Sequence, residues 1–284
     1  MMHFLHALVD GSLLGVFMIS ASTFAVLLFH PRFLGARVMP PLVRRLLMGL
    51  AMGATSMGLI YSPLGMYSGA HMNPSVTLAF AALGKVAAVD TVLYIAAQCV
   101  LGIVGMKVAH LILGEYLSHE SVAFVTTRPG SRGPAAAARV EFAISFVLFF
   151  VVLLASNYLP THRFTGALAG GLVATWITLF APVSGMSMNP ARTLASAVIA
   201  RRYAFVWMYM VVPPLGMQAA AFAFDGLHRN VFCAKLCHAS SAPCPFDCKF
   251  GELAGSCDSC DASRQQTDVA GNSPVDSLRR LRCP

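Results

Sequence analysis

Two asparagine residues, Asn73 and Asn189, occupy the same place in two copies of one short sequence. Residues 68–81 read SGAHMNPSVTLAFA and residues 184–197 read SGMSMNPARTLASA, so most aligned positions are identical. In each copy the asparagine caps a helix, a proline fills the first helical position, and about three apolar turns follow. Side-chain amides and helix N-termini both present N–H donors and partial positive charge. The pattern therefore offers hydrogen bonding and electrostatic selection rather than bond making.

The apolar composition sets the surroundings in which these groups act. The chain is 57% hydrophobic and only 11% charged, whereas soluble domains carry about 25% charged residues. This balance predicts a multi-pass membrane protein. The net charge of +8 comes mostly from arginines in connecting segments, where it suits loops and lipid headgroups, and we expect no nucleic-acid partner.

Six apolar stretches are long enough to cross about 30 Å of hydrocarbon. We place them at residues 9–29, 46–64, 91–113, 139–158, 164–181 and 203–224, the last interrupted by Pro213-Pro214. Each half of the chain, about residues 9–113 and 139–224, holds three spans and one half-length helix, at 73–84 or 189–200. Because three is odd, the second half enters from the opposite face. The expected fold is an all-α membrane protein with six transmembrane helices and two re-entrant half-helices in an inverted 3+3 repeat.

The two half-helices should meet, because an irregular loop inside a bilayer is tolerated only where it is buried in protein or lines a wet cavity. The amides of Asn73 and Asn189 would then donate to whatever passes, and carbonyls of the loops before them would accept. Two converging positive helix ends repel cations, and water held by two donors is oriented against proton hopping. A secondary transporter would need more intramembrane carboxylates than Glu141 and Asp10 supply, so the pattern favours a passive path.

The chain resembles the aquaporin and glycerol-facilitator family over about residues 9–224. The motifs that carry the resemblance are SGAH-x-NP and NPAR, supported by Glu141, by residues 94–98 (YIAAQ) and by Pro213 with Gly216. The paired motif residues are Asn73, Pro74 and Ser75 in the first copy and Asn189, Pro190 and Ala191 in the second, with Ser75 in a place that usually holds alanine. The resemblance implies a water channel in the plasma membrane and a homotetramer with cytoplasmic termini. No nucleophile–base arrangement stands out in the sequence, so we expect no enzymatic activity.

The resemblance also implies a selectivity filter. Arg192 would be the constriction arginine, joined by Met186, Ile177 and either Met52 or Gly53. Ile177 falls where water-selective members carry histidine, so this filter is apolar except for Arg192 and is expected to be wide. Water is the first expected permeant, and glycerol, ammonia, peroxide and undissociated metalloid acids stay open.

A buried glutamate braces the re-entrant loop in each half of this family by accepting backbone N–H groups. Glu141 fills that place in the second half, but the first half offers either Ser12 or Asp10, and we expect its loop to be held less firmly. For His71, in the first loop, we expect a structural hydrogen bond, with pH gating as the alternative.

The orientation of the chain receives two opposed predictions. The family resemblance places both termini in the cytoplasm. The positive-inside rule favours the reverse, because the loops on the family's outer side hold nine arginines while the inner segments hold Lys85, Arg163, Arg229 and Lys235.

Residues 225–284 form a polar tail, distinct from the channel domain at residues 1–224, and we expect residues 261–284 to be disordered. Seven of the eight cysteines lie in the tail. The candidate ligands of a zinc or soft-metal site, the one cofactor the sequence suggests, are Cys233, Cys237, Cys244, Cys248, Cys257 and Cys260. The alternatives are a disulfide-prone or lipidated end, and the broader functional alternative is a tail-based metal sensor with a vestigial pore.

Overall fold

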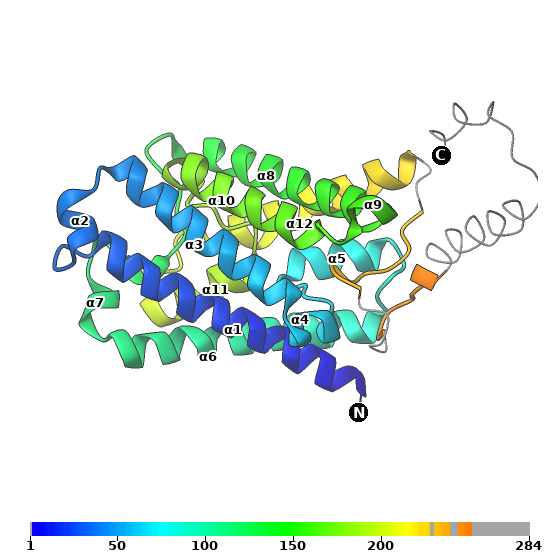
Figure 1. The fold of residues 1–284 in the computed structure, drawn as a ribbon. Helices are drawn as coiled ribbons and strands as arrows, with labels where there is room; N and C mark the ends of the chain where they lie inside the picture. The colour runs from blue at the N-terminus through cyan, green and yellow to red at the C-terminus, as the bar shows by residue number, and fades with distance from the viewer. Residues whose placement is uncertain (1, 228–229, 239–243, 252–284) are drawn as a thin grey trace, which may run out of the picture.

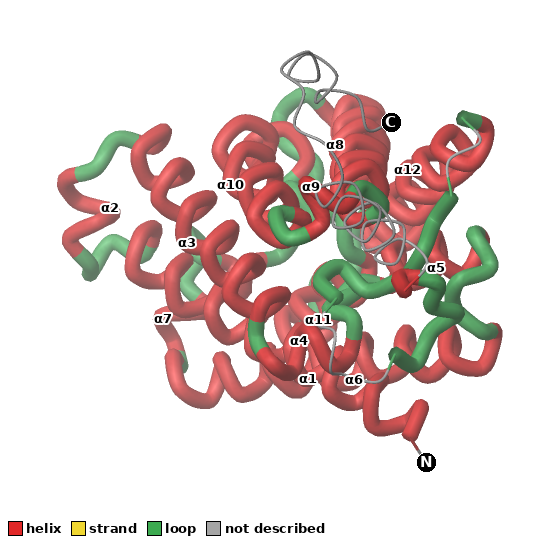
Figure 2. The backbone as a smooth tube through the Cα atoms, turned by 45° about the vertical axis from the view of Figure 1, so that its right-hand side comes forward, coloured by secondary structure: helices red, strands yellow, loops and turns green. Residues whose placement is uncertain are grey.

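The computed structural model describes residues 2–227, 230–238 and 244–251, and the expected disorder of residues 261–284 lies outside them. The described chain is helical almost throughout, with loops at the helix ends (Figures 1 and 2). The elements are α1 (Met2–Phe29), α2 (Leu34–Val38), α3 (Pro41–Tyr61), α4 (Pro63–Ser68), α5 (Pro74–Ala82), α6 (Ala88–Leu113), α7 (Glu115–Ser118), the 3₁₀ turn η1 (Ala123–Val125), α8 (Gly133–Ser156), α9 (Leu159–His162), α10 (Thr165–Ser184), α11 (Pro190–Ala200) and α12 (Val206–Gly226).

The six predicted spans correspond to α1, α3, α6, α8, α10 and α12, and the two predicted half-helices to α5 and α11. Among the described residues, five of these long helices combine the length and hydropathy of a membrane span. The exception is α3, which is 21 residues long but begins with a turn containing Arg44 and Arg45. The prediction that Pro213-Pro214 interrupts the last span is wrong, because α12 runs through both prolines. Helices in membranes tolerate proline where neighbouring groups satisfy the freed carbonyls.

The packing of the helices follows the sequence repeat. In the first half α1 packs along α6, and in the second half α8 packs in the same way along α12. Between the halves, α3 packs against α10, while α5 lies against α12 and α11 against α6. Each half-helix is thus held by the closing helix of the other half, which is the contact pattern of an inverted repeat.

Glycines allow the long helices to approach closely. A Cβ atom on Gly105 of α6 would lie 2.4 Å from the carbonyl oxygen of Gly15 in α1, and one on Gly53 of α3 would lie 2.5 Å from that of Gly170 in α10. No real Cβ fits at such distances, so these crossings need glycine. Small residues at helix crossings are typical of membrane proteins, in which backbones approach closely to gain packing.

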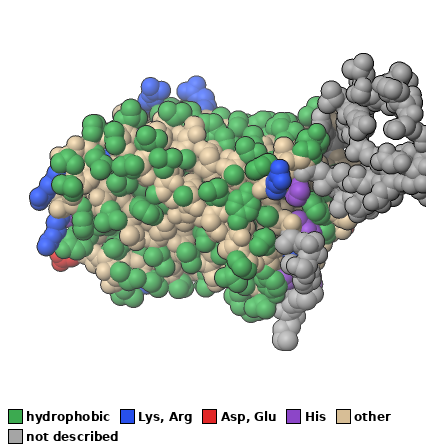
Figure 3. Space-filling model, in the orientation of Figure 1, with side chains coloured by type: hydrophobic (Ala, Val, Ile, Leu, Met, Phe, Trp, Pro, Cys, Tyr) green, Lys and Arg blue, Asp and Glu red, His purple; other side chains and the backbone are tan. Residues whose placement is uncertain are grey.

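The outer surface is that of a protein solvated by lipid. Large apolar side chains on the long helices are strongly exposed, including Val89, Leu111, Ile112 and Trp207, each with at least 66% of its surface accessible. Figure 3 shows apolar side chains spread over the middle of the molecule, with most of the visible Lys and Arg toward the end that carries α2. Soluble monomers rarely expose apolar surface on this scale.

The glycine crossings lead to a stability prediction. Changing Gly105→Ala should destabilise the protein by about 1–3 kcal/mol, because the new methyl group collides with the α1 backbone. Gly58→Ala, in α3, is the matched control, since a Cβ there meets no atom within 4 Å, and it should leave stability unchanged or raised. Thermal unfolding of the purified variants in detergent measures the difference, and equal melting temperatures for the two variants would contradict the assignment.

Candidate pore

The two motif loops have the same strained backbone. Ala70 and Met72 in the first loop, and Met186 and Met188 in the second, all have φ between 48° and 57°. This left-handed conformation costs residues other than glycine about 1–3 kcal/mol each and persists only where the surroundings enforce it. The loops are therefore built for a particular arrangement of their N–H and C=O groups.

The two asparagines join the loops to each other across the centre of the molecule. Asn73 Nδ2 donates to the carbonyl of Met188 at 2.9 Å, and Asn189 Nδ2 donates to the carbonyl of Met72 at 2.7 Å. Each Oδ1 caps its own half-helix, by accepting from the backbone N–H of Ser75 or Arg192. Each amide nitrogen carries two hydrogens, so one per asparagine remains beyond this reciprocal pair of bonds.

The remaining motif residues are packed where α5 and α11 begin. Pro74 and Pro190 are the first residues of these helices, and both are buried. Ser75 and Ala191, which follow them, are 0% exposed. A small side chain is required at both places, and serine meets that requirement.

A buried carboxylate braces each loop. Glu141 accepts from the hydroxyl of Ser184 and from the backbone N–H groups of Ser187 and Met188 at 2.7–2.9 Å. Asp10 accepts in the same way from the hydroxyl of Ser68 (3.3 Å) and the N–H of Met72 (2.8 Å).

Gln98, in α6, adds a third donor to Asp10 at 2.7 Å. Ser12 is exposed and bonds to the carbonyl of Leu8 within α1, so Asp10 rather than Ser12 is the first brace. The expectation of a less firmly held first loop is wrong, because Asp10, two residues from Ser12 and on a different face of α1, accepts three hydrogen bonds, as many as Glu141 does.

Two tyrosines complete the symmetry. Tyr94 of α6 donates to the carbonyl of Ser68 at 2.6 Å, and Tyr209 of α12 donates to that of Ser184 at 2.5 Å. The sequence assigned neither tyrosine a contact with a motif loop. Their equivalence becomes visible only when α6 and α12 occupy matching places.

Two cavities meet at Arg192. The central cavity, about 130 Å³, contains both asparagines. The vestibule, about 370 Å³, opens among residues of the α7–α8 connection such as Ser121 and Arg128. The two cavities share four wall residues, which are Met48, Ile177, Met186 and Arg192.

This shared wall is the candidate filter. The structure places Ile177, Met186 and Arg192 together there. Met52 lines only the central cavity and not the vestibule, and Gly53 packs on α10. Met48 was missed, although it lies one turn from Met52 on the same face of α3. Among the described residues Arg192 is in no ion pair, and its buried Nη1 has no hydrogen-bond partner. This guanidinium is available to water or solute.

Comparison with known proteins agrees with this geometry. The family profile described as major intrinsic protein matches residues 2–224. The chain belongs to the major intrinsic protein family. It is 37% identical over 181 residues to aquaporin NIP1-2 of Oryza sativa subsp. japonica and 39% identical over 178 residues to the probable aquaporin NIP4-2 of Arabidopsis thaliana.

Each of these matches covers 61% of this chain, and they span 57% and 59% of the two relatives, so less than two thirds of either. Among solved structures the aquaglyceroporin from Plasmodium falciparum matches with a TM-score of 0.63 and 20% identity. That match covers 79% of this chain and 97% of the other, and it supports the fold alone. Members of the major intrinsic protein family are channels rather than enzymes.

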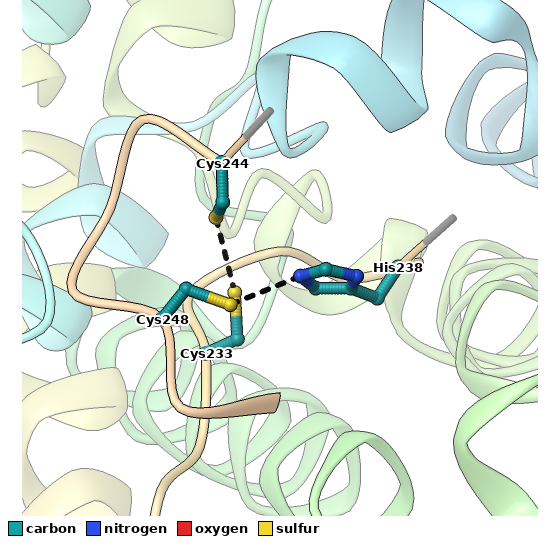
Figure 4. A group of neighbouring side chains, drawn as sticks. All are labelled: Cys233, His238, Cys244 and Cys248. Carbon is teal, nitrogen blue, oxygen red and sulfur yellow. Dashed lines mark hydrogen bonds between the residues drawn. The ribbon is translucent and has the colours of Figure 1, made fainter. Parts of the chain in front are cut away.

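The described part of the tail lies beside the channel and brings three of the six candidate metal ligands together with His238, which was not among the candidates. The ligand atoms of Cys233, His238, Cys244 and Cys248 all lie within 4.8 Å of one another (Figure 4). Cys237 is outside this group and packs against the apolar core. Cys257 and Cys260 lie outside the described residues.

The bracing carboxylates give a testable prediction for this family member. Asp10→Ala and Glu141→Ala should each destabilise the protein, because each leaves three donors without their acceptor, at about 1–3 kcal/mol for every buried donor that stays unpaired. Ser12→Ala is the control and should change stability by less than about 0.5 kcal/mol. Melting temperature in detergent provides the readout. A Ser12→Ala variant as damaged as Asp10→Ala would refute the assigned brace.

Proposed function

We propose that this chain is a passive transmembrane channel for water and small neutral solutes that excludes protons and ions. The observation that carries the proposal is the reciprocal pair of bonds by which Asn73 and Asn189 tie two half-helix N-termini together inside the central cavity. The remaining amide hydrogens would orient water in opposite senses on either side of the junction, which opposes proton hopping. The paired positive helix ends oppose cations.

The filter favours a second candidate permeant beside water. Met48, Ile177 and Met186 present only apolar surface around Arg192. A wall of flexible and branched apolar side chains with one cationic donor suits a small polyol or an undissociated metalloid acid, which offers hydroxyls to the arginine and a less polar side to the methionines. Glycerol and metalloid acids are therefore proposed as additional permeants.

The setting proposed for the channel is the plasma membrane, with cytoplasmic termini and a homotetrameric assembly. The exposed apolar surface supports a lipid environment, and the family relationship supports the rest. We propose no catalytic role, because the polar groups of the site serve to bind, orient and exclude.

Stopped-flow measurement on proteoliposomes tests the function. Under an osmotic gradient the protein should speed volume change well beyond that of empty liposomes, while a pH gradient across the same membranes should persist. An Asn73→Ala variant should lose part of this proton exclusion, because it lacks the amide that donates to the carbonyl of Met188 and to passing water. Transport that requires an ion gradient, or wild-type protein that collapses the pH gradient, would overturn the proposal.

The apolar filter gives a separate prediction. Ile177→His should narrow the passage and lower the ratio of glycerol to water permeability by about tenfold, which corresponds to about 1.4 kcal/mol of added barrier for glycerol. Ile177→Val is the matched control and should leave that ratio near the wild-type value. An unchanged ratio in Ile177→His would show that the constriction lies elsewhere.

A further inference from the structure

The described tail lies across the end of the channel that carries the N-terminus (Figure 1, orange). Its first anchor is in the second half of the chain, where the backbone N–H of Phe232 donates to Asn157 Oδ1 at 2.7 Å. Another anchor is in the first half, where Lys85 Nζ donates to Asp247 at 2.8 Å. This ion pair lowers the pKa of the Asp247 carboxyl. The tail is therefore attached to both halves of the channel.

Between these anchors the tail enters the central cavity. Leu236 is 6% exposed and belongs to the wall of the cavity that contains Asn73 and Asn189. Its backbone N–H donates to the carbonyl of Gly69 at 3.2 Å, at the start of the first motif loop. In this structure a tail residue thus occupies the side of the pore remote from the vestibule.

His71 holds the same tail segment from inside the first motif loop. Its Nε2 donates to the carbonyl of Ala234 at 2.9 Å, and its ring stacks on Phe246 with 5.0 Å between centroids and 3° between planes. Phe246 is itself nearly buried, and it fills the space that a Cβ on Gly69 would need. The expected structural hydrogen bond of His71 therefore links the pore loop to the tail.

The cysteine cluster encloses these docking residues in the sequence. Cys233 directly precedes Ala234, and Cys244 lies two residues before Phe246. The sulfurs of Cys233 and Cys244 are 3.4 Å apart, and His238 Nε2 lies 3.1 Å from the sulfur of Cys248 (Figure 4). Tetrahedral zinc with bonds of about 2.3 Å to sulfur separates its ligand atoms by roughly 3.8 Å, so small shifts would accommodate the ion.

The backbone around the cluster is also suited to thiolates. The N–H of Lys235 donates to the sulfur of Cys233 at 3.4 Å. The N–H groups of Phe246 and Phe250 donate in the same way to Cys244 and Cys248, each from two residues further along the chain. Hydrogen bonds to a charged acceptor are the strong ones, and such outer-shell donors orient metal ligands.

The His238 ring is held by stacking on Phe250 at 4.4 Å. Three sulfurs and one imidazole nitrogen form the Cys₃His set typical of structural zinc.

We propose that Cys233, His238, Cys244 and Cys248 bind Zn²⁺, and that the bound ion fixes the tail across the pore with Leu236 in the central cavity, closing the channel. Removal of zinc releases the docked residues 233–238 and 244–246 and opens the path. The gating half of this inference rests on the proposed channel function, whereas the metal half does not. If the released tail binds no zinc, a free zinc concentration 100 times the dissociation constant of zinc from the docked tail favours the closed form about 100-fold.

Metal binding is tested on the full-length protein in detergent. After incubation with Zn²⁺ and removal of excess, wild type and Cys237→Ser should retain about one zinc ion per chain, and the double variant Cys233→Ser/Cys244→Ser should retain none. Co²⁺ substitution should give thiolate charge-transfer bands in the first two proteins only. Equal zinc content in all three, or a Cys233–Cys244 disulfide in the metal-free wild type that prevents loading, would overturn the metal site.

Gating is tested by osmotic flux in proteoliposomes with Zn²⁺ or with a membrane-permeant chelator. In wild type and Cys237→Ser the chelator should raise the flux, whereas the double cysteine variant should conduct at the raised level in both conditions. Leu236→Ala should retain zinc and still conduct more than wild type with Zn²⁺ present. An osmotic flux that is the same with Zn²⁺ and with chelator, and the same in wild type and Leu236→Ala, would overturn the gating. Absence of flux in every variant would instead overturn the channel function, while the zinc content would still decide the metal site.

Discussion

The structure depends on satisfying two irregular loops in the middle of an apolar protein. Backbone groups that leave a helix at this depth have no bulk water to bind, and each orphaned group costs several kcal/mol. Asp10 and Glu141 satisfy loop N–H groups by accepting from them, and Tyr94 and Tyr209 satisfy one loop carbonyl each by donating to it. Without these four side chains, nothing would compensate the strain of the left-handed residues on which the motif geometry depends.

Once the loops are fixed, the asparagines can act. The side-chain oxygen of each asparagine accepts from its own half-helix, and one amide hydrogen is donated to the opposite loop. The junction is therefore symmetric and rigid. The filter is not symmetric, since Met186 and Arg192 come from the second loop and helix α11 while the first half contributes Met48 from α3. In the proposed channel, exclusion of charge thus rests on both halves, whereas solute choice rests mainly on the second.

The tail connects with this machinery at its most constrained point. His71 lies in the loop that Asp10 braces, and it bonds both to Thr77 of the half-helix and to the tail backbone. A tail held here contacts the pore through a loop that is itself fixed by hydrogen bonds. This loop is therefore a suitable docking site for the tail, and the three cysteines and one histidine beside it would hold the tail in position by binding a metal ion.

The sequence by itself determined the repeat, the six spans and two half-helices, the inverted order of the halves and the identity of Asn73 and Asn189, while the resemblance to a family pointed to Arg192. The first four features follow from local patterns, since capping, apolar length and an odd number of spans are evident in neighbouring residues. The tertiary structure decided what depends on contacts between distant segments. It selected Asp10 over Ser12 because helix rotation, not sequence offset, determines which side chain faces the loop. It placed Met48 in the filter because the packing of α3 on α10 brings Met48 and Ile177 into one cavity wall, and it gathered four tail ligands beside Leu236 because the tail folds back on His71.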